Sequence, residues 1–149
     1  MYAFFQRDNV ALPGLAAYFE EQHQDERKHA RKLISYLNRR GGRVHLLTIP
    51  EPVQEFAHEE KGDALHAMEL SLALEKLNYD KLSHLDKVAS DLEDFNLADF
   101  VDDMLEEQSK DVKQAADYVA QLTRVGKGHG VWDWDARLFD SLNEEEEVA

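Results

Sequence analysis

The chain has 149 residues, and its 31 acidic residues against 17 lysines and arginines give a formal net charge of −14 at pH 7. That length favours a single domain with one core, and the 43% apolar fraction is enough to build it. The acid excess argues against nucleic acid as a partner, because phosphates need a basic face. The sequence has no cysteine, which excludes disulfides, thiolate zinc sites and cysteine nucleophiles. No apolar run approaches the roughly 20 residues that span a bilayer, so we expect no membrane partner.

Glycines and prolines divide the chain into helical segments. Pro13 suits the first turn of a helix, where its missing N–H is harmless. Gly62 marks either the true start of the second long segment or an early weak point in it, and Asn96 with Asp99 resembles a capping box for the third. The predicted elements are long helices over 13–38, 55–88 and 96–125, a short helix over 131–142 and an acidic tail over 143–149. The lengths predict an all-α bundle, in which the long connection after residue 40 lets the first two helices run parallel.

The start of the chain is apolar and has no cap. Residues 1–6 are interpreted as the last turn of a helix whose beginning is absent, and they do not resemble a signal or transit peptide. Three long helices leave apolar stripes without facing partners. We therefore expect a four-helix bundle whose first helix is largely truncated.

Polar side chains interrupt the apolar stripe of each long helix near its midpoint. The interruptions are Gln22, Glu26 and His29 in the first, Glu75 in the second and Gln108 in the third. They fall on the face that should be driest, where a carboxylate without partners is costly. A cation between converging carboxylates would remove that cost. Glu26 and His29 are three residues apart and share a helical face, which is the half-site spacing of carboxylate-bridged di-iron bundles. Oxygen ligands with one imidazole suit iron(II) or manganese.

Each interruption also has an ordinary structural explanation. Glu-x-x-His pairs on helices are often exposed to solvent and bind nothing. Glu75 can pair with a nearby lysine or arginine, and Gln108 can be a core amide with satisfied hydrogen bonds. The pattern alone leaves these alternatives open.

Several segments, in their order and spacing, resemble ferritin, and in particular its plant and green-algal branch. They are Asp25-Glu26-Arg27-Lys28-His29-Ala30, Arg40-Gly41-Gly42-Arg43-Val44, Glu60-Lys61-Gly62-Asp63-Ala64-Leu65, Leu74-Glu75-Lys76-Leu77 and Arg124-Val125-Gly126-Lys127-Gly128-His129-Gly130-Val131-Trp132. The resemblance covers essentially the whole chain. It implies one ferritin-like domain over 1–149, a four-helix bundle with a long crossover and a short C-terminal fifth helix. It also implies a homo-oligomeric shell of twenty-four subunits that stores ferric oxide, and residence in the plastid.

The resemblance further implies a ferroxidase, which oxidises iron(II) with dioxygen at a di-iron centre inside the subunit. Glu26 matches the bridging glutamate, His29 the imidazole on the first iron, Glu75 the carboxylate on the second iron and Gln108 the nearby glutamine. Asp111 is a further candidate ligand. A glutamate and a tyrosine of the family's first helix have no counterpart here, so the first iron site lacks one ligand. The alternatives are a non-catalytic structural subunit and, more remotely, a metal-free acidic helical interaction module.

Asp99 and Asp102 match the acidic pair that lines the threefold pores of ferritin shells. From Ser90 to Asp111 there are nine acids and one base, a field that draws in cations. Acids near a helix start can also simply favour the helix dipole. The spacing from Asp99 to Gln108 is one residue shorter than is usual in the family. We expect one of the two to be displaced around the helix unless a local irregularity absorbs the change.

Overall fold

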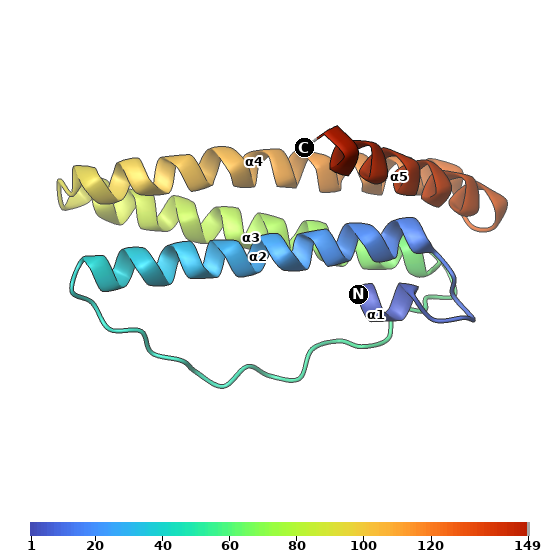
Figure 1. Cartoon of the computed structure of the whole chain (residues 1–149), viewed down its shortest axis with the longest axis horizontal. Helices are drawn as coiled ribbons and strands as arrows, with labels where there is room; N and C mark the ends of the chain where they lie inside the picture. Colours follow the sequence, from blue (N-terminus) through green and yellow to red (C-terminus); the bar gives the residue numbers. More distant parts are fainter. Residues whose placement is uncertain (149) are drawn as a thin grey trace. The chain divides into compact units, whose positions relative to one another are not determined.

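The chain is helical apart from its turns and one long connection, in a computed structural model that describes residues 1–148 and side chains as far as residue 144. The helices, seen in Figure 1, are α1 (Tyr2–Phe5), α2 (Pro13–Arg39), α3 (Asp63–Asp91), α4 (Phe95–Val125) and α5 (His129–Val148). Residues 1–148 contain no strand, so the predicted all-α class is confirmed. Within this described part, no helix combines the length and apolar character needed to cross a bilayer. The chain forms two compact units, residues 57–131 and residues 1–56 with those from Trp132 onward, which we describe separately.

The unit of residues 57–131 is a hairpin of α3 and α4, which run side by side in opposite directions in Figure 1. The buried residues of α4 recur at helical steps and are Val101, Met104, Gln108, Ala115 and Leu122. Those of α3 are Ala64, Ala67, Met68, Ser71, Glu75 and Ala89. This spacing is that of an amphipathic helix, and it brings one carboxylate and one amide into the buried face.

The start of α3 differs from the prediction, because the helix begins at Asp63 and not near residue 55. Gly62, the N-cap residue, has φ +83°, a left-handed conformation that a glycine adopts without strain. Lys127 donates a hydrogen bond from Nζ to the carbonyl oxygen of Glu59 and holds the preceding loop. Of the two roles predicted for Gly62, the structure shows the helix start, with Gly62 as the N-cap, and the residues before it belong to the connection. The helix also ends three residues later than predicted, at Asp91.

The N-cap of α4 also differs from the prediction. The helix begins at Phe95, and its N-cap is Asp94, whose side chain accepts a hydrogen bond from the Leu97 N–H at 3.2 Å. The predicted capping box of Asn96 and Asp99 is therefore wrong. Asparagine and aspartate are equally good N-caps, so the turn that leaves α3 decides which of them is used.

The other unit is organised around aromatic side chains from α1, α2 and the end of the long connection. Phe4 contacts Phe5 and Phe56 edge-on, with ring centroids 5.1 and 5.4 Å apart, and Phe5 stacks on Phe19 at 5.7 Å. These four side chains are buried. Such pairs stabilise beyond their buried area. They fix residues 1–6, predicted as a helix end and observed as the single turn α1, against the first turns of α2.

The last helix is longer than predicted. α5 begins at His129 and continues to Val148, so the bounds 131–142 predicted for a short helix are wrong, and the predicted acidic tail is helical as far as Val148. Glutamate is a favourable helix residue, and no glycine or proline follows Gly130 to stop the helix. The acidic residues of the tail therefore extend α5. Ala149 lies outside the described residues.

Candidate metal site

Glu26 and His29 form the first pair of predicted ligands, in the middle of α2. The Nδ1 atom of His29 and Oε1 of Glu26 are 4.0 Å apart, and the pair is ionic only when the imidazole is protonated. Two donors on one tetrahedral ion with bonds of about 2.1 Å lie about 3.4 Å apart, so these two atoms have to approach by roughly half an ångström to share an ion. The helix spacing alone brings these two donors together.

The expectation that this pair lies in a buried seam is wrong for Glu26. The side chain of Glu26 is 51% exposed, and that of His29 is 19% exposed. In α2, all of which is described, the buried residues are confined to the first two turns: Gly14, Leu15, Ala16, Tyr18 and Phe19. Further along, Leu33 and Leu37 remain 37% and 41% exposed. The periodicity marks the apolar face of α2 correctly, but burial also requires a facing element.

Glu75 and Gln108 form the second pair, which joins α3 to α4. Both are buried, with exposed fractions of 8% and 4%, as the interrupted stripes predicted. The Gln108 side-chain amide donates from Nε2 to Glu75 Oε2 at 2.6 Å and to the Glu75 carbonyl oxygen at 3.2 Å. A hydrogen bond to a carboxylate is stronger than one between neutral groups. Gln108 therefore has satisfied hydrogen bonds, and its N–H group lies against an oxygen that a cation would otherwise contact.

The acidic pair at the start of α4 lies on a different face from Gln108. Asp99 and Asp102 are exposed, and α4 is an unbroken α-helix from Phe95 to Val125. Nine residues correspond to about 900°, which places Asp99 and Gln108 on opposite sides of the helix. No irregularity absorbs the one-residue shortening within α4. The structure thus buries the glutamine and leaves the two aspartates facing outward.

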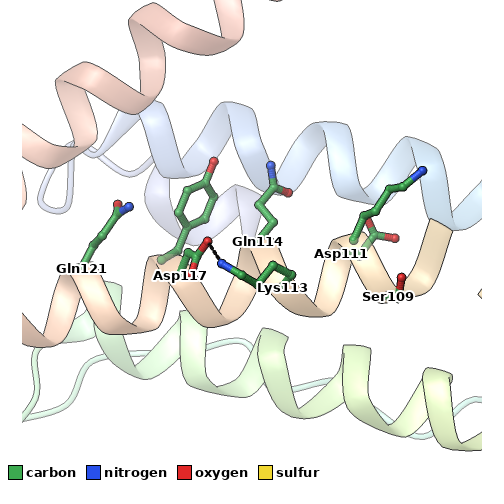
Figure 2. A pocket seen from close by; sticks show the side chains of 8 residues that line it. Ser109, Asp111, Lys113, Gln114, Asp117 and Gln121 are labelled. Carbon is green, nitrogen blue, oxygen red and sulfur yellow. Dashed lines mark hydrogen bonds and ion pairs between the residues drawn. The ribbon is translucent and has the colours of Figure 1, made fainter. Parts of the chain in front are cut away.

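Asp111 lines an open groove of about 630 Å³ along α4 (Figure 2). The lining residues are Ser109, Lys110, Asp111, Lys113, Gln114, Asp117, Tyr118 and Gln121. Lys113 and Asp117 are paired through Nζ and Oδ2, as the dashed line in Figure 2 marks. The groove carries two carboxylates and two ammonium groups, so it has no net preference for a cation. Its charge balance does not support Asp111 as a ligand.

The predicted site residues therefore occur as two pairs, one within each unit. Among the side chains that the structure describes, which end at residue 144, no group of three or more from histidine, aspartate and glutamate is close enough to hold a metal ion. The Glu26–His29 pair supplies a carboxylate and an imidazole, and the Glu75–Gln108 pair supplies a carboxylate and an amide. Both sets contain the hard oxygen donors that suit iron(II) or manganese.

Asp135 is a buried carboxylate that binds the backbone of another helix, and the sequence did not predict this contact. It is 2% exposed and accepts hydrogen bonds from the backbone N–H groups of Gly14 and Leu15 at 2.9 and 2.7 Å. Burial raises the pKa of Asp135, and the two backbone hydrogen bonds act in the opposite direction. The available signal was a carboxylate on the apolar face of α5, next to Trp134 and one turn before Leu138.

Comparisons with known proteins agree on one family. The family described as "Ferritin-like domain" matches residues 1–125. "Ferritin-2, chloroplastic" of Vigna unguiculata is 57% identical over 140 residues, which cover 93% of this chain and 56% of that protein. "Ferritin-3, chloroplastic" of Glycine max is 56% identical over 140 residues, or 93% of this chain and 55% of that protein. The crystal structure of a ferritin from the green alga Ulva pertusa matches with a TM-score of 0.89 at 49% identity, covering 93% of this chain and 72% of that one. This chain thus spans about half the length of these plant relatives.

Proposed function

Because the chain belongs to the ferritin family, we propose that its protein stores iron, by oxidising iron(II) with dioxygen and depositing the ferric product as a mineral. The observation that carries the proposal is the buried carboxylate of Glu75 beside Gln108. A carboxylate in such a place is costly unless it has partners, and a cation is the strongest of them. Since the chain spans about half of its plant relatives, the activity is proposed for the whole protein.

Glu26 and His29 are proposed to bind the first iron(II). The carboxylate contributes negative charge, and the imidazole is a ligand only in its neutral form. Their atoms, 4.0 Å apart, need little movement to share an ion. The half-exposed side chain of Glu26 leaves it room to reorient towards an ion.

Glu75 is proposed to bind the second iron(II), with Gln108 beside it. In the structure, the Gln108 N–H group donates to Glu75 Oε2 at 2.6 Å. A cation at this oxygen requires the amide to turn so that its carbonyl oxygen faces the ion, since an N–H group and a metal ion cannot share one lone pair. Two iron(II) ions would each give one electron to one dioxygen, which with two protons from water becomes hydrogen peroxide, and the surrounding carboxylates would stabilise the higher charge of the ferric product.

The outward-facing acids of α4 are proposed to guide iron(II) towards the protein. Asp99 and Asp102 lie in a stretch with nine acids and one base, whose field raises the local concentration of cations. Their exposure on α4 suits a surface that cations reach from solvent. Asp111 is proposed as a weaker contributor, because the groove that it lines also holds two lysines.

Assembly and location complete the proposal. We infer a homo-oligomeric shell, of twenty-four subunits by resemblance to ferritins, with iron(II) and dioxygen as substrates. The relatives from Vigna unguiculata and Glycine max are named as chloroplastic, and we propose residence in the plastid for this protein as well.

A structural subunit that stores iron oxidised elsewhere is the second candidate. The 51% exposure of the Glu26 side chain favours this candidate, because water competes with an exposed carboxylate for the metal ion and weakens its binding. The two candidates differ in one property, the rate at which the protein itself oxidises iron(II).

Iron(II) oxidation under air, followed by the absorbance of the ferric product in a stopped-flow instrument, tests the proposal. Glu75→Gln keeps the shape of the side chain and removes its charge, and we expect the initial rate to fall at least about tenfold. Glu69→Gln is the matched control on α3, because Glu69 pairs with Lys61 at 2.6 Å and belongs to neither predicted pair. A Glu75→Gln protein that oxidises iron at the wild-type rate would contradict the assignment. Wild-type protein that is no faster than buffer would favour the structural subunit.

A further inference from the structure

The first turn of α2 lacks a cap from its own part of the sequence. Its N-cap residue is Leu12, whose side chain cannot accept a hydrogen bond, and Pro13 follows at the first helical position. The N–H groups at the start of a helix have no partner within the helix. Two of them, on Gly14 and Leu15, are satisfied by Asp135, which comes 121 and 120 residues later in the chain.

The contact between Asp135 and the first turn of α2 is close and shielded from solvent. A Cβ atom placed on Gly14 would lie 2.1 Å from the carbonyl oxygen of Asp135, so the backbones of α2 and α5 meet at this point. Leu15 is fully buried, and Trp134 and Leu138 of α5 are 9% and 5% exposed. Water has no access to the two N–H groups while α5 is in place.

Separation of α5 from the first turn of α2 leaves polar groups on both sides without their hydrogen-bond partners. If α5 leaves, the N–H groups of Gly14 and Leu15 lose their acceptor and must be hydrated. If the first turn of α2 unwinds, the carboxylate of Asp135 loses both donors and is left buried without them. A buried charge that loses its partners is strongly unfavourable, so neither event is expected to occur alone.

We propose that Asp135 makes α5 and the first turn of α2 one cooperative unit, in which α5 is a detachable N-cap for α2. The two segments then open and close together, although more than a hundred residues separate them in sequence. Whatever displaces α5 also frays the start of α2.

Tryptophan fluorescence can report whether α5 is in contact with α2. Its two tryptophans, Trp132 and Trp134, both lie in α5, and the first is 60% exposed while the second is 9% exposed. Trp132→Phe leaves Trp134 as the single probe of α5 docking, read by its emission maximum and by acrylamide quenching. Amide hydrogen exchange at Gly14 and Leu15 reports the first turn of α2.

In the Trp132→Phe background, we expect Asp135→Ala to shift the Trp134 emission to longer wavelength. Exchange at Gly14 and Leu15 should accelerate at least about tenfold in the same variant. Asp133→Ala is the matched control, because it removes the same charge from α5 at a residue paired with Arg137 on the surface at 2.9 Å. It should change neither readout.

The proposal is overturned if Asp135→Ala exposes Trp134 while Gly14 and Leu15 exchange as before, if exchange accelerates while Trp134 stays buried, or if neither changes. Should Asp135→Ala fail to fold, native-state exchange of the Trp132→Phe protein at increasing urea decides the matter. Equal opening free energies for the amides of α5 and of the first turn of α2 support one unit. Different values exclude it.

Discussion

The carboxylate of Asp135 is bound to the backbone of Gly14 at the start of α2, with 2.9 Å between Oδ2 and the glycine nitrogen. The contact closes a loop of more than a hundred residues and connects the last helix of the chain to the first long one. It depends on a side chain at one end and on the lack of a side chain at the other. Both halves of this requirement can be tested.

Gly14→Ala should destabilise the protein by about 1–3 kcal/mol, because the new Cβ would overlap the Asp135 carbonyl oxygen. Urea unfolding followed by tryptophan emission measures the loss. Gly41→Ala is a useful comparison, since Gly41 has φ +77° but nothing within 4 Å of an added Cβ. Its cost is backbone strain alone, about 1 kcal/mol. A Gly14→Ala protein as stable as the wild type would show that α5 does not lie against α2 at this point.

The pKa of Asp135 sets the direction of a pH effect. Burial raises this pKa above its ordinary value of 3.8, so the folded protein binds the proton more tightly than the unfolded chain. The contribution of Asp135 to stability is therefore complete below pH 3.8 and declines as the pH rises through the raised pKa. Its charged neighbours on α5, Asp133 and Arg137, pair with each other, and the first turn of α2 carries no acid.

Asp135→Asn removes this titration. The stability of the wild type relative to Asp135→Asn should be greatest in acid and should fall towards neutral pH, as measured by urea unfolding at a series of pH values. Asp133→Asn, on the same helix, should show no such trend. A difference between wild type and Asp135→Asn that grows with rising pH would mean that the two backbone hydrogen bonds outweigh burial.

Gln108→Glu tests whether the buried pair of α3 and α4 is suited to a cation. A second carboxylate would face Glu75 where the amide now donates at 2.6 Å, and we expect a loss of about 3–5 kcal/mol without metal. Manganese(II), which dioxygen does not oxidise readily, should restore much of that stability. The measurement is the melting temperature with and without the ion. Gln114→Glu, in the exposed groove of α4, is the control. Equal effects of manganese on both variants would argue against a site at Glu75.

Glu26 and His29 can be tested by binding alone. Calorimetric titration with manganese(II) should show a loss of affinity of about 10- to 100-fold for His29→Ala at one class of site. Glu20→Ala serves as the control, because Glu20 lies on α2 and accepts a hydrogen bond from Gln24 at 3.0 Å. An unchanged isotherm for His29→Ala would exclude this histidine as a ligand.

The sequence was sufficient for those features that depend on neighbours along the chain. Helical periodicity identified the three long helices and placed Glu75 and Gln108 on buried faces, because a helix repeats every 3.6 residues whatever surrounds it. The resemblance to ferritins also rests on short sequence motifs, and the match to the ferritin-like domain confirms it. The proximity of Glu26 and His29 could also be predicted from the sequence, since residues three apart on a helix share one face.

Only the tertiary structure decided the rest, because burial and capping depend on what comes from elsewhere in the chain. Glu26 has the periodicity of a seam residue, yet it is half exposed, since periodicity marks a face and does not supply the element that covers it. α3 begins at Asp63 after its N-cap Gly62 and not near residue 55, and Lys127 of a distant segment donates a hydrogen bond to Glu59 in the loop before it. Asp135 looks like an ordinary helix residue until folding brings the uncapped N–H groups of α2 to it, at a distance in sequence that no local pattern can bridge.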